Sequence, residues 1–106
     1  MRSYHHPAPE DIRLHDVLFA LSDPTRSRLV GLLRERGEHT VGGLAEHAGA
    51  IPKSTMSYHN KTLREAGVTR IRSEGTRCFV SLRSEDLEAR YPGLLDLLLA
   101  YAANEA

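Results

Sequence analysis

One stretch decides the fold of this chain: residues 53–67, which read KSTMSYHNKTLREAG. Four of its residues recur at the spacing of one helix face and are expected to be buried: Met56, His59, Leu63 and Ala66. The other face carries hydroxyl and amine groups, from Lys53, Ser54, Thr55, Ser57, Tyr58 and Lys61. Gly67 follows as a C-cap, so we expect an amphipathic helix over residues 53–66 with one polar, cationic face.

Two helices are predicted in the N-terminal third of the chain. The first covers residues 9–21, where a proline and two acids precede apolar residues at helical spacing. The second begins with Asp23 as N-cap and Pro24 at the first helical position, where the missing N–H costs nothing, and it ends near Gly37.

A short third helix is predicted over residues 41–47, with Thr40 as its cap. Gly43 within it is expected to permit the close approach of a neighbouring helix. A turn over residues 48–52 then leads to the helix at 53–66. This order predicts a helix-turn-helix unit over residues 40–67.

Beyond Gly67 the pattern changes to strand formers. Residues 68–73 and 76–82 predict a hairpin joined across Glu74-Gly75, which forms a wing over residues 68–83. Ser84 is expected to cap a further helix, which a Tyr-Pro-Gly sequence interrupts. The leucine-rich tail that follows is apolar on nearly every side, so one of its faces needs a partner, most economically a second copy of the chain.

Length and composition exclude several classes of protein. A chain of 106 residues with 41% hydrophobic and 26% charged residues is one folded domain, not a multidomain enzyme, a disordered tail or a membrane protein. Its longest apolar run, residues 97–103, is far shorter than the ~20 residues that span a bilayer. With one cysteine and no apolar leader in residues 1–7, we expect a cytoplasmic protein.

Charge is unevenly distributed along a chain whose formal net charge is zero. Residues 1–21 sum to −1 and residues 84–106 to −4, whereas residues 53–83 sum to +5. A phosphate backbone responds to this local excess, because salt screens charges beyond about 8 to 10 Å. The excess therefore permits binding to nucleic acid despite the neutral total.

The order of elements and the place of the charge are those of a winged helix-turn-helix, a mainly α (α+β) fold with five or six helices and one β-hairpin. The second helix of such a unit enters the DNA major groove. The expected DNA contacts are Lys53, Ser54, Thr55, Ser57, Tyr58 and Lys61 on this helix, with Arg72 and Arg77 on the flanks of the wing. Two other interpretations stay open: a helix face that only meets water, and a hairpin whose charge prevents aggregation.

Four runs of residues carry a resemblance that covers roughly residues 14–99. They are ALSDPTR at 20–26, LAE at 44–46, STMSYHNKTLREAGV at 54–68 and EGTR at 74–77. In this order and spacing they resemble the ArsR/SmtB family of dimeric winged-helix transcription regulators. The sequence departs from the family pattern at Asn60, where the family usually has a large, often apolar residue.

The resemblance implies a homodimer that binds an imperfect palindrome near a promoter, usually as a repressor released by a ligand. Its first and last helices, residues 9–21 and 84–103 here, would form the dimer. The expected interface residues are Leu14, Leu18, Leu94, Leu95 and Leu98. Residues 1–8 would form a flexible arm.

Two kinds of metal site found in the family are missing from this sequence. The soft-metal C-x-C pair aligns with Thr40 and Gly42, and the last helices hold no histidine. What remains is a group of N-terminal histidines, His5, His6 and His15, with acids nearby; imidazole and carboxylate suit nickel or zinc. The other interpretation of these histidines is that they are ordinary solvent-exposed residues.

We therefore predict one domain over residues 1–106 that binds double-stranded DNA sequence-specifically as a homodimer and regulates transcription, as a repressor. A metal response and a partner protein are further hypotheses. The alternative function is a winged-helix module that assembles proteins without DNA. An enzyme is not expected, because Cys78 alternates with apolar strand residues and no motif supplies a positioned base.

Overall fold

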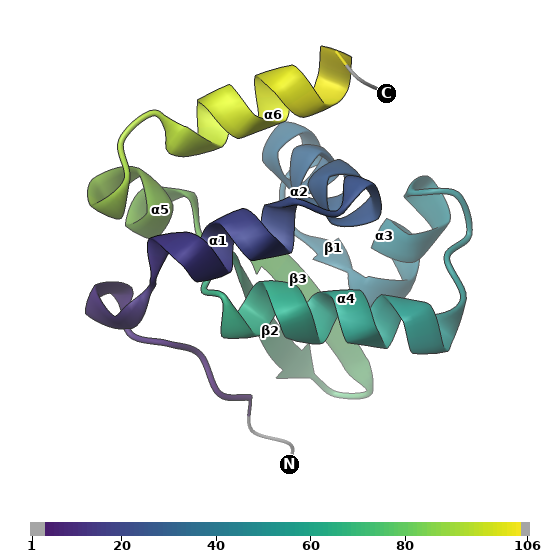
Figure 1. Cartoon of the computed structure of the whole chain (residues 1–106). Coiled ribbons are helices and arrows are strands. Elements are labelled where there is room, and N and C mark those ends of the chain that lie inside the picture. The colour runs from purple at the N-terminus through teal and green to yellow at the C-terminus, as the bar shows by residue number, and fades with distance from the viewer. Residues whose placement is uncertain (1–3, 105–106) are drawn as a thin grey trace.

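The structure, a computed structural model, describes residues 4–104 as helices packed around a small antiparallel sheet (Figure 1). The helices are α1 (Leu14–Leu21), α2 (Pro24–Arg36), α3 (Val41–His47), α4 (Lys53–Glu65), α5 (Ser84–Arg90) and α6 (Leu94–Asn104), with a 3-10 helix η1 (Pro9–Asp11) before them. The strands are β1 (His39–Thr40), β2 (Thr69–Glu74) and β3 (Arg77–Leu82), in the sheet order β1-β3-β2. The predicted winged helix-turn-helix is confirmed.

The first helix begins at Leu14, so the prediction of a helix from residue 9 was wrong. Ile12 is extended and only 1% exposed, because its side chain turns into the core. Its carbonyl accepts bonds from Arg90 Nε and from Tyr91 Oη, each at 3.0 Å. These long-range bonds fix the chain in an extended form between η1 and α1.

The caps of α2 and α3 lie where the sequence placed them. Asp23 Oδ2 accepts from the Arg26 amide at 3.0 Å, and Thr40 Oγ1 accepts from the Gly43 amide at 3.0 Å. A Cβ atom on Gly43 would lie 2.8 Å from Thr40 Oγ1. Gly43 therefore makes room for the cap, not for a neighbouring helix as expected.

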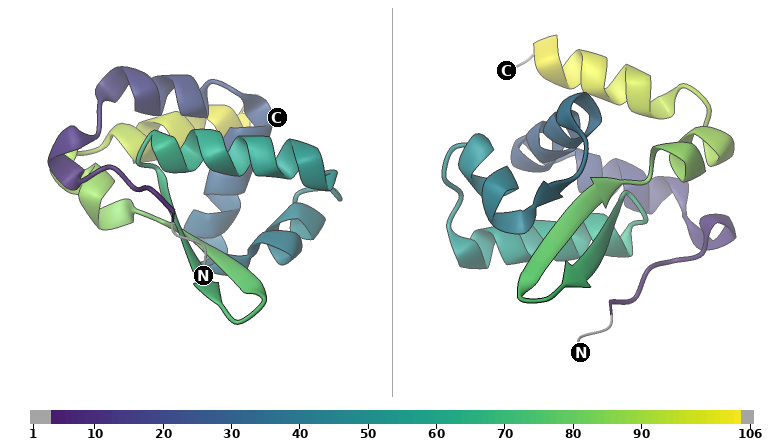
Figure 2. Two further views of the ribbon diagram at one scale, coloured as in Figure 1. Left: turned by 90° about the horizontal axis from the view of Figure 1, so that it is seen from below. Right: turned by 180° about the vertical axis from the view of Figure 1, so that it is seen from behind.

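The sheet has one strand more than predicted. The short β1 pairs with β3 through His39 opposite Val80, and too few residues take part for a sequence pattern to show it. Glu74 pairs with Arg77, so the hairpin turn is Gly75-Thr76, one residue later than expected. The tip of this hairpin projects beyond the helices as a wing (Figure 2).

The C-terminal helices close the core on the far side from the wing. Ser84 is the first residue of α5 and not its cap, since Arg83 occupies the N-cap position and makes no capping bond. Tyr91 and Gly93 separate α5 from α6, as predicted. Helix α6 lies across α2 and buries Leu95 against the core (Figures 1 and 2).

Candidate nucleic-acid interface

The two faces of α4 divide as the sequence predicted. Met56, His59 and Leu63 are buried on the inner face, together with Asn60. The predicted DNA contacts of the helix are all exposed: Lys53, Ser54, Thr55, Ser57, Tyr58 and Lys61. Hydroxyl and amine groups of this kind match base edges and phosphates. These residues form one continuous exposed surface on α4, which is accessible to a groove of DNA.

A tight turn sets the angle between α3 and α4. Gly49 and Ala50 have φ values of 105° and 58°, in the left-handed region. The Ile51 amide then donates to the Ala45 carbonyl at 3.2 Å, which ties the end of the turn to α3. The geometry of the helix-turn-helix is thus fixed by backbone contacts before any DNA is bound.

A buried arginine supports α4 from beneath, a role that no local sequence pattern indicates. Arg26 is 5% exposed, and its Nε donates to the Ala20 carbonyl at 2.7 Å. Its Nη1 lies 3.2 Å from His59 Nδ1, so it joins the end of α1 to the inner face of α4. The guanidinium also lies 5.9 Å from the ring centroid of Tyr58 on the outer face. The ALSDPTR run contains Arg26, but only the fold brings it to His59.

The end of α4 is fixed by close packing. Gly67 has φ 84°, and a Cβ atom there would lie 2.6 Å from Cγ1 of Ile12. Only glycine satisfies both the backbone conformation and this contact. The C-terminal end of α4 is therefore held against the segment that precedes α1.

The two predicted wing contacts differ in their surroundings. Arg72 donates to Glu38 at 2.8 Å and to Glu74 at 2.7 Å, and this pairing holds the pKa of the Glu38 carboxyl below its usual value. Arg77 is exposed and stacks 5.3 Å from the Phe79 ring centroid, with no carboxylate partner in residues 4–104. Of the two guanidinium groups, Arg77 is thus the one free to meet a phosphate.

Acidic residues outside the 53–83 segment reduce its charge in the fold. Asp86 lies 3.6 Å from Arg70 and 3.0 Å from the buried Arg83. A count along the sequence cannot show this, because Glu38 and Asp86 reach the wing only after folding. The cations left on the surface are mainly Lys53 and Lys61 of α4 and Arg77 of the wing.

The N-terminal arm, expected to be flexible over residues 1–8, makes specific contacts from Tyr4 onward; its first three residues lie outside the described part. Arg64 and Arg83 donate to the carbonyls of His5 and Pro7, at 2.7 and 2.8 Å. His6 Nε2 accepts from the Ile71 amide of β2 at 3.0 Å. The arm therefore lies along the open edge of the sheet.

The three N-terminal histidines do not form a metal site within one chain. Residues 4–104 contain no group of three His, Cys, Asp or Glu side chains placed to hold an ion. His6 uses its Nε2 atom for the Ile71 amide, whereas His5 and His15 are exposed on different segments. Within residues 4–104 of one chain, these histidines are therefore not gathered into the nickel or zinc site that the sequence suggested.

The five predicted dimer leucines fall into two groups. Leu14 and Leu18 are each 37% exposed on α1. Leu94, Leu95 and Leu98 instead line a small apolar crevice against α1 and α5, inside the protomer. The large apolar residues that α6 exposes are Leu97 and Tyr101. The solvent-exposed face of α6 is therefore a different one from the face predicted.

A winged helix-turn-helix with an exposed polar face on its second helix is typical of DNA-binding transcription regulators. Comparisons with known proteins place the chain in this class. A model described as "Helix-turn-helix domain" matches residues 21–72. The HTH-type transcriptional regulator YceK of Bacillus subtilis is 39% identical over 82 residues, which cover 77% of this chain and 82% of YceK.

Two solved structures share the fold closely. The transcriptional repressor BigR from Xylella fastidiosa has a TM-score of 0.66 at 32% identity, covering 83% of this chain and 84% of BigR. The ArsR family transcriptional regulator RHA00566 has a TM-score of 0.64 at 26% identity, covering 95% of each chain. The chain belongs to the ArsR family of helix-turn-helix transcriptional regulators. It is a DNA-binding regulator of the repressor type and not an enzyme.

No helix in the described residues combines the length and the hydropathy that a membrane crossing requires.

Proposed function

We propose that this repressor binds DNA through the exposed face of α4, with Ser57 and Tyr58 reading base edges in the major groove. Lys53, Lys61 and Arg77 contact phosphates and position the protein without reading sequence. The observation that carries the proposal is the continuous exposed face of α4, held rigid by Arg26 beneath it and flanked by the wing.

The protein acts as a homodimer through the outer faces of α1 and α6. Leu14 and Leu18 on α1, with Leu97 and Tyr101 on α6, leave apolar surface that a second copy would cover. The two helices approach each other in the core, since Val17 and Leu21 of α1 line the same crevice as Leu98 of α6. A two-fold dimer would place its two α4 helices about 34 to 36 Å apart, on the half-sites of a palindrome.

A salt-dependent DNA titration tests this function. The protein is titrated into labelled duplex DNA from the promoter of its gene, and binding is followed by fluorescence anisotropy. The titration is repeated at physiological salt concentration and at lower salt concentrations. We expect a specific complex whose affinity falls steeply with salt, because phosphate contacts release counterions. A protein-assembly module would give no specific complex at any salt concentration, and that result would overturn the proposal.

A further inference from the structure

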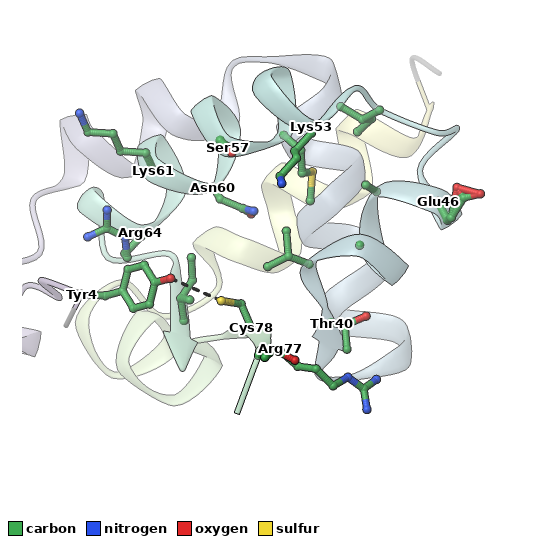
Figure 3. Close-up of a pocket in the computed structure, with 17 residues that line it drawn as sticks. Tyr4, Thr40, Glu46, Lys53, Ser57, Asn60, Lys61, Arg64, Arg77 and Cys78 are labelled. Atoms are coloured by element: carbon green, nitrogen blue, oxygen red, sulfur yellow. Dashed lines mark hydrogen bonds between the residues drawn. The ribbon is translucent and has the colours of Figure 1, made fainter. Parts of the chain in front are cut away.

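A groove of about 860 Å³ lies between α4, the wing and the start of α3 (Figure 3). Apolar side chains make up much of its lining, among them Val41, Ile51, Met56 and Ile71. Tyr4 also lines the groove, and its Oη lies 3.4 Å from Cys78 Sγ. Its size lies in the range of about 300 to 1,000 Å³ that is usual for small-molecule sites.

A buried amide on the groove lacks its hydrogen bonds. Asn60 is 5% exposed, and its Oδ1 has no partner among the described residues. Figure 3 shows its side chain directed from α4 into the groove. Burial of an unpaired polar group costs free energy, and an amide can turn to present either its N–H₂ or its oxygen. The amide nitrogen of Asn60 points into the groove in Figure 3, so it can donate a hydrogen bond to an acceptor group of a ligand.

The charge around the groove selects the ligand. Lys53 is directed towards the space in Figure 3, whereas Lys61 extends away from it. Arg64 and Arg77 also line the groove, and Glu46 is the one acidic residue among its lining residues. A cationic rim over an apolar floor favours an anion that carries an apolar body.

We propose that the groove binds a small organic carboxylate with an apolar body, and that this ligand competes with DNA. The carboxylate accepts hydrogen bonds from the Asn60 amide and from Lys53 Nζ, while the apolar body lies on Met56 and Ile71. Competition follows because Lys53 and Ser57 belong both to the groove and to the DNA-reading face. This last step rests on the proposed function of α4.

The binding step is tested without DNA. 2-Naphthoate and decanoate are titrated into the ¹⁵N-labelled protein, beside the neutral 2-naphthamide and decanamide. We expect saturable NMR shifts at the Asn60 side-chain amide and the Ile71 amide, with at least about tenfold tighter binding of the acids than of the amides. No saturable shift at these groups with either acid, or equal binding of acids and amides, overturns the proposal.

Two pairs of variants locate the ligand. Asn60→Leu, of similar size and apolar, should weaken binding of the acid at least about tenfold, whereas Asn104→Leu on α6 should leave it unchanged. Lys53→Gln should weaken it about three- to fivefold and Lys61→Gln should not, although both remove one exposed charge from α4. Because Lys53 is exposed, its variant keeps the test valid if Asn60→Leu does not fold. Equal effects within each pair contradict the proposed site.

A DNA competition separates the failure of this inference from that of the proposed function. If the protein binds promoter DNA, 2-naphthoate releases that DNA, and the Asn60→Leu variant resists the release, then the proposed function and the groove proposal both hold. If the protein binds DNA and neither acid binds in the NMR titration, the groove proposal alone fails. If the acids bind but no duplex does, the reading role of α4 fails and the competition with it.

Discussion

Arg26 links the position of α4, the helix proposed to read DNA, to the end of α1. Its guanidinium is nearly inaccessible to water, yet it meets the Ala20 carbonyl, the Phe19 carbonyl and His59 Nδ1. A buried charge is tolerated only when its donors are bonded in this way. One side chain thereby connects α1, α2 and α4, so a disturbance at α1 reaches the reading helix directly.

Replacing Arg26 with leucine should lower the free energy of unfolding by about 2 to 3 kcal/mol, because the bonds of a charged donor are lost and His59 is left unpaired. Urea denaturation measures the change. Arg28→Leu is the matched control in the same helix, since Arg28 is exposed and makes one long bond to the Ala48 carbonyl at 3.3 Å. A loss below about 0.5 kcal/mol for Arg26→Leu would contradict this role.

The spacing of residues predicts which side chains of α4 are exposed. It does not predict which arginines of the wing are paired with a carboxylate. Met56 and His59 fall on the inner face because the helical period places them there. Arg72 looked equivalent to Arg77 in the sequence. Only the fold brings Glu38 to Arg72, across 34 positions of the chain, and no local pattern reports such a pairing.

The wing, as an element, presents one free guanidinium and one paired guanidinium. Arg77→Gln should weaken binding to all duplexes alike and reduce the slope of log affinity against log salt by about 1, as the loss of one phosphate contact predicts. Arg72→Gln should change the slope less, because Glu38 and Glu74 already hold its charge. Anisotropy titrations at four salt concentrations measure both slopes, and equal reductions would show that the pairing does not persist on DNA.

The N-terminal arm is held by a histidine that must stay neutral. Burial and the nearby Arg70, Arg64, Arg83 and His5 lower the pKa of His6 below its usual 6.5. The undocked arm therefore binds the proton more tightly than the docked arm. Docking is complete above about pH 6.5 and weakens as the pH falls through the lowered pKa.

An NMR titration from pH 8 to 5 tests this coupling. The Ile71 amide, which donates to His6 Nε2, should lose protection from hydrogen exchange as His6 becomes charged. His6→Ala should remove the pH dependence, whereas His5→Ala, which alters an exposed ring, should retain it. A His6 pKa at or above 6.5 would be inconsistent with the docked arm.

Elements with strong local signals were predicted well and those fixed at long range were not. The caps at Asp23 and Thr40 locate α2 and α3 because capping is a local bond. The break before α1 depends on Ile12 accepting bonds from Arg90 and Tyr91, which lie far along the chain. Strand β1 likewise exists only because β3 offers an edge.

At the scale of the whole molecule, the proposed dimer forms through the apolar outer faces of α1 and α6. Leu97 is 53% exposed, so Leu97→Glu should leave the fold intact and convert the dimer to a monomer by placing a charge in an apolar interface. Analytical ultracentrifugation measures the mass. Ala89→Glu, which adds the same charge on an exposed position of α5, should remain dimeric. A wild-type monomer, or a dimeric Leu97→Glu, would place the interface elsewhere.

The fold class and the exposed polar face of α4 could be predicted from the sequence, because both follow from the periodicity of apolar and polar residues. The orientation of α6 could not. Its leucines lie on nearly every side, so only packing against α2 decides that Leu95 faces inward and Leu97 outward. The groove beside Asn60 could not be predicted from the sequence either, since it forms between segments that are distant in the chain.

Selection from a pool of random duplex DNA tests the central claim most directly, with wild type beside a Ser57→Ala, Tyr58→Ala double variant. We predict that the wild type enriches a palindrome whose half-sites lie about 10 base pairs apart, and that the double variant loses this preference while it keeps salt-sensitive binding to any duplex. Enrichment of the same palindrome by both proteins, or of no sequence by the wild type, would contradict the reading of bases by α4.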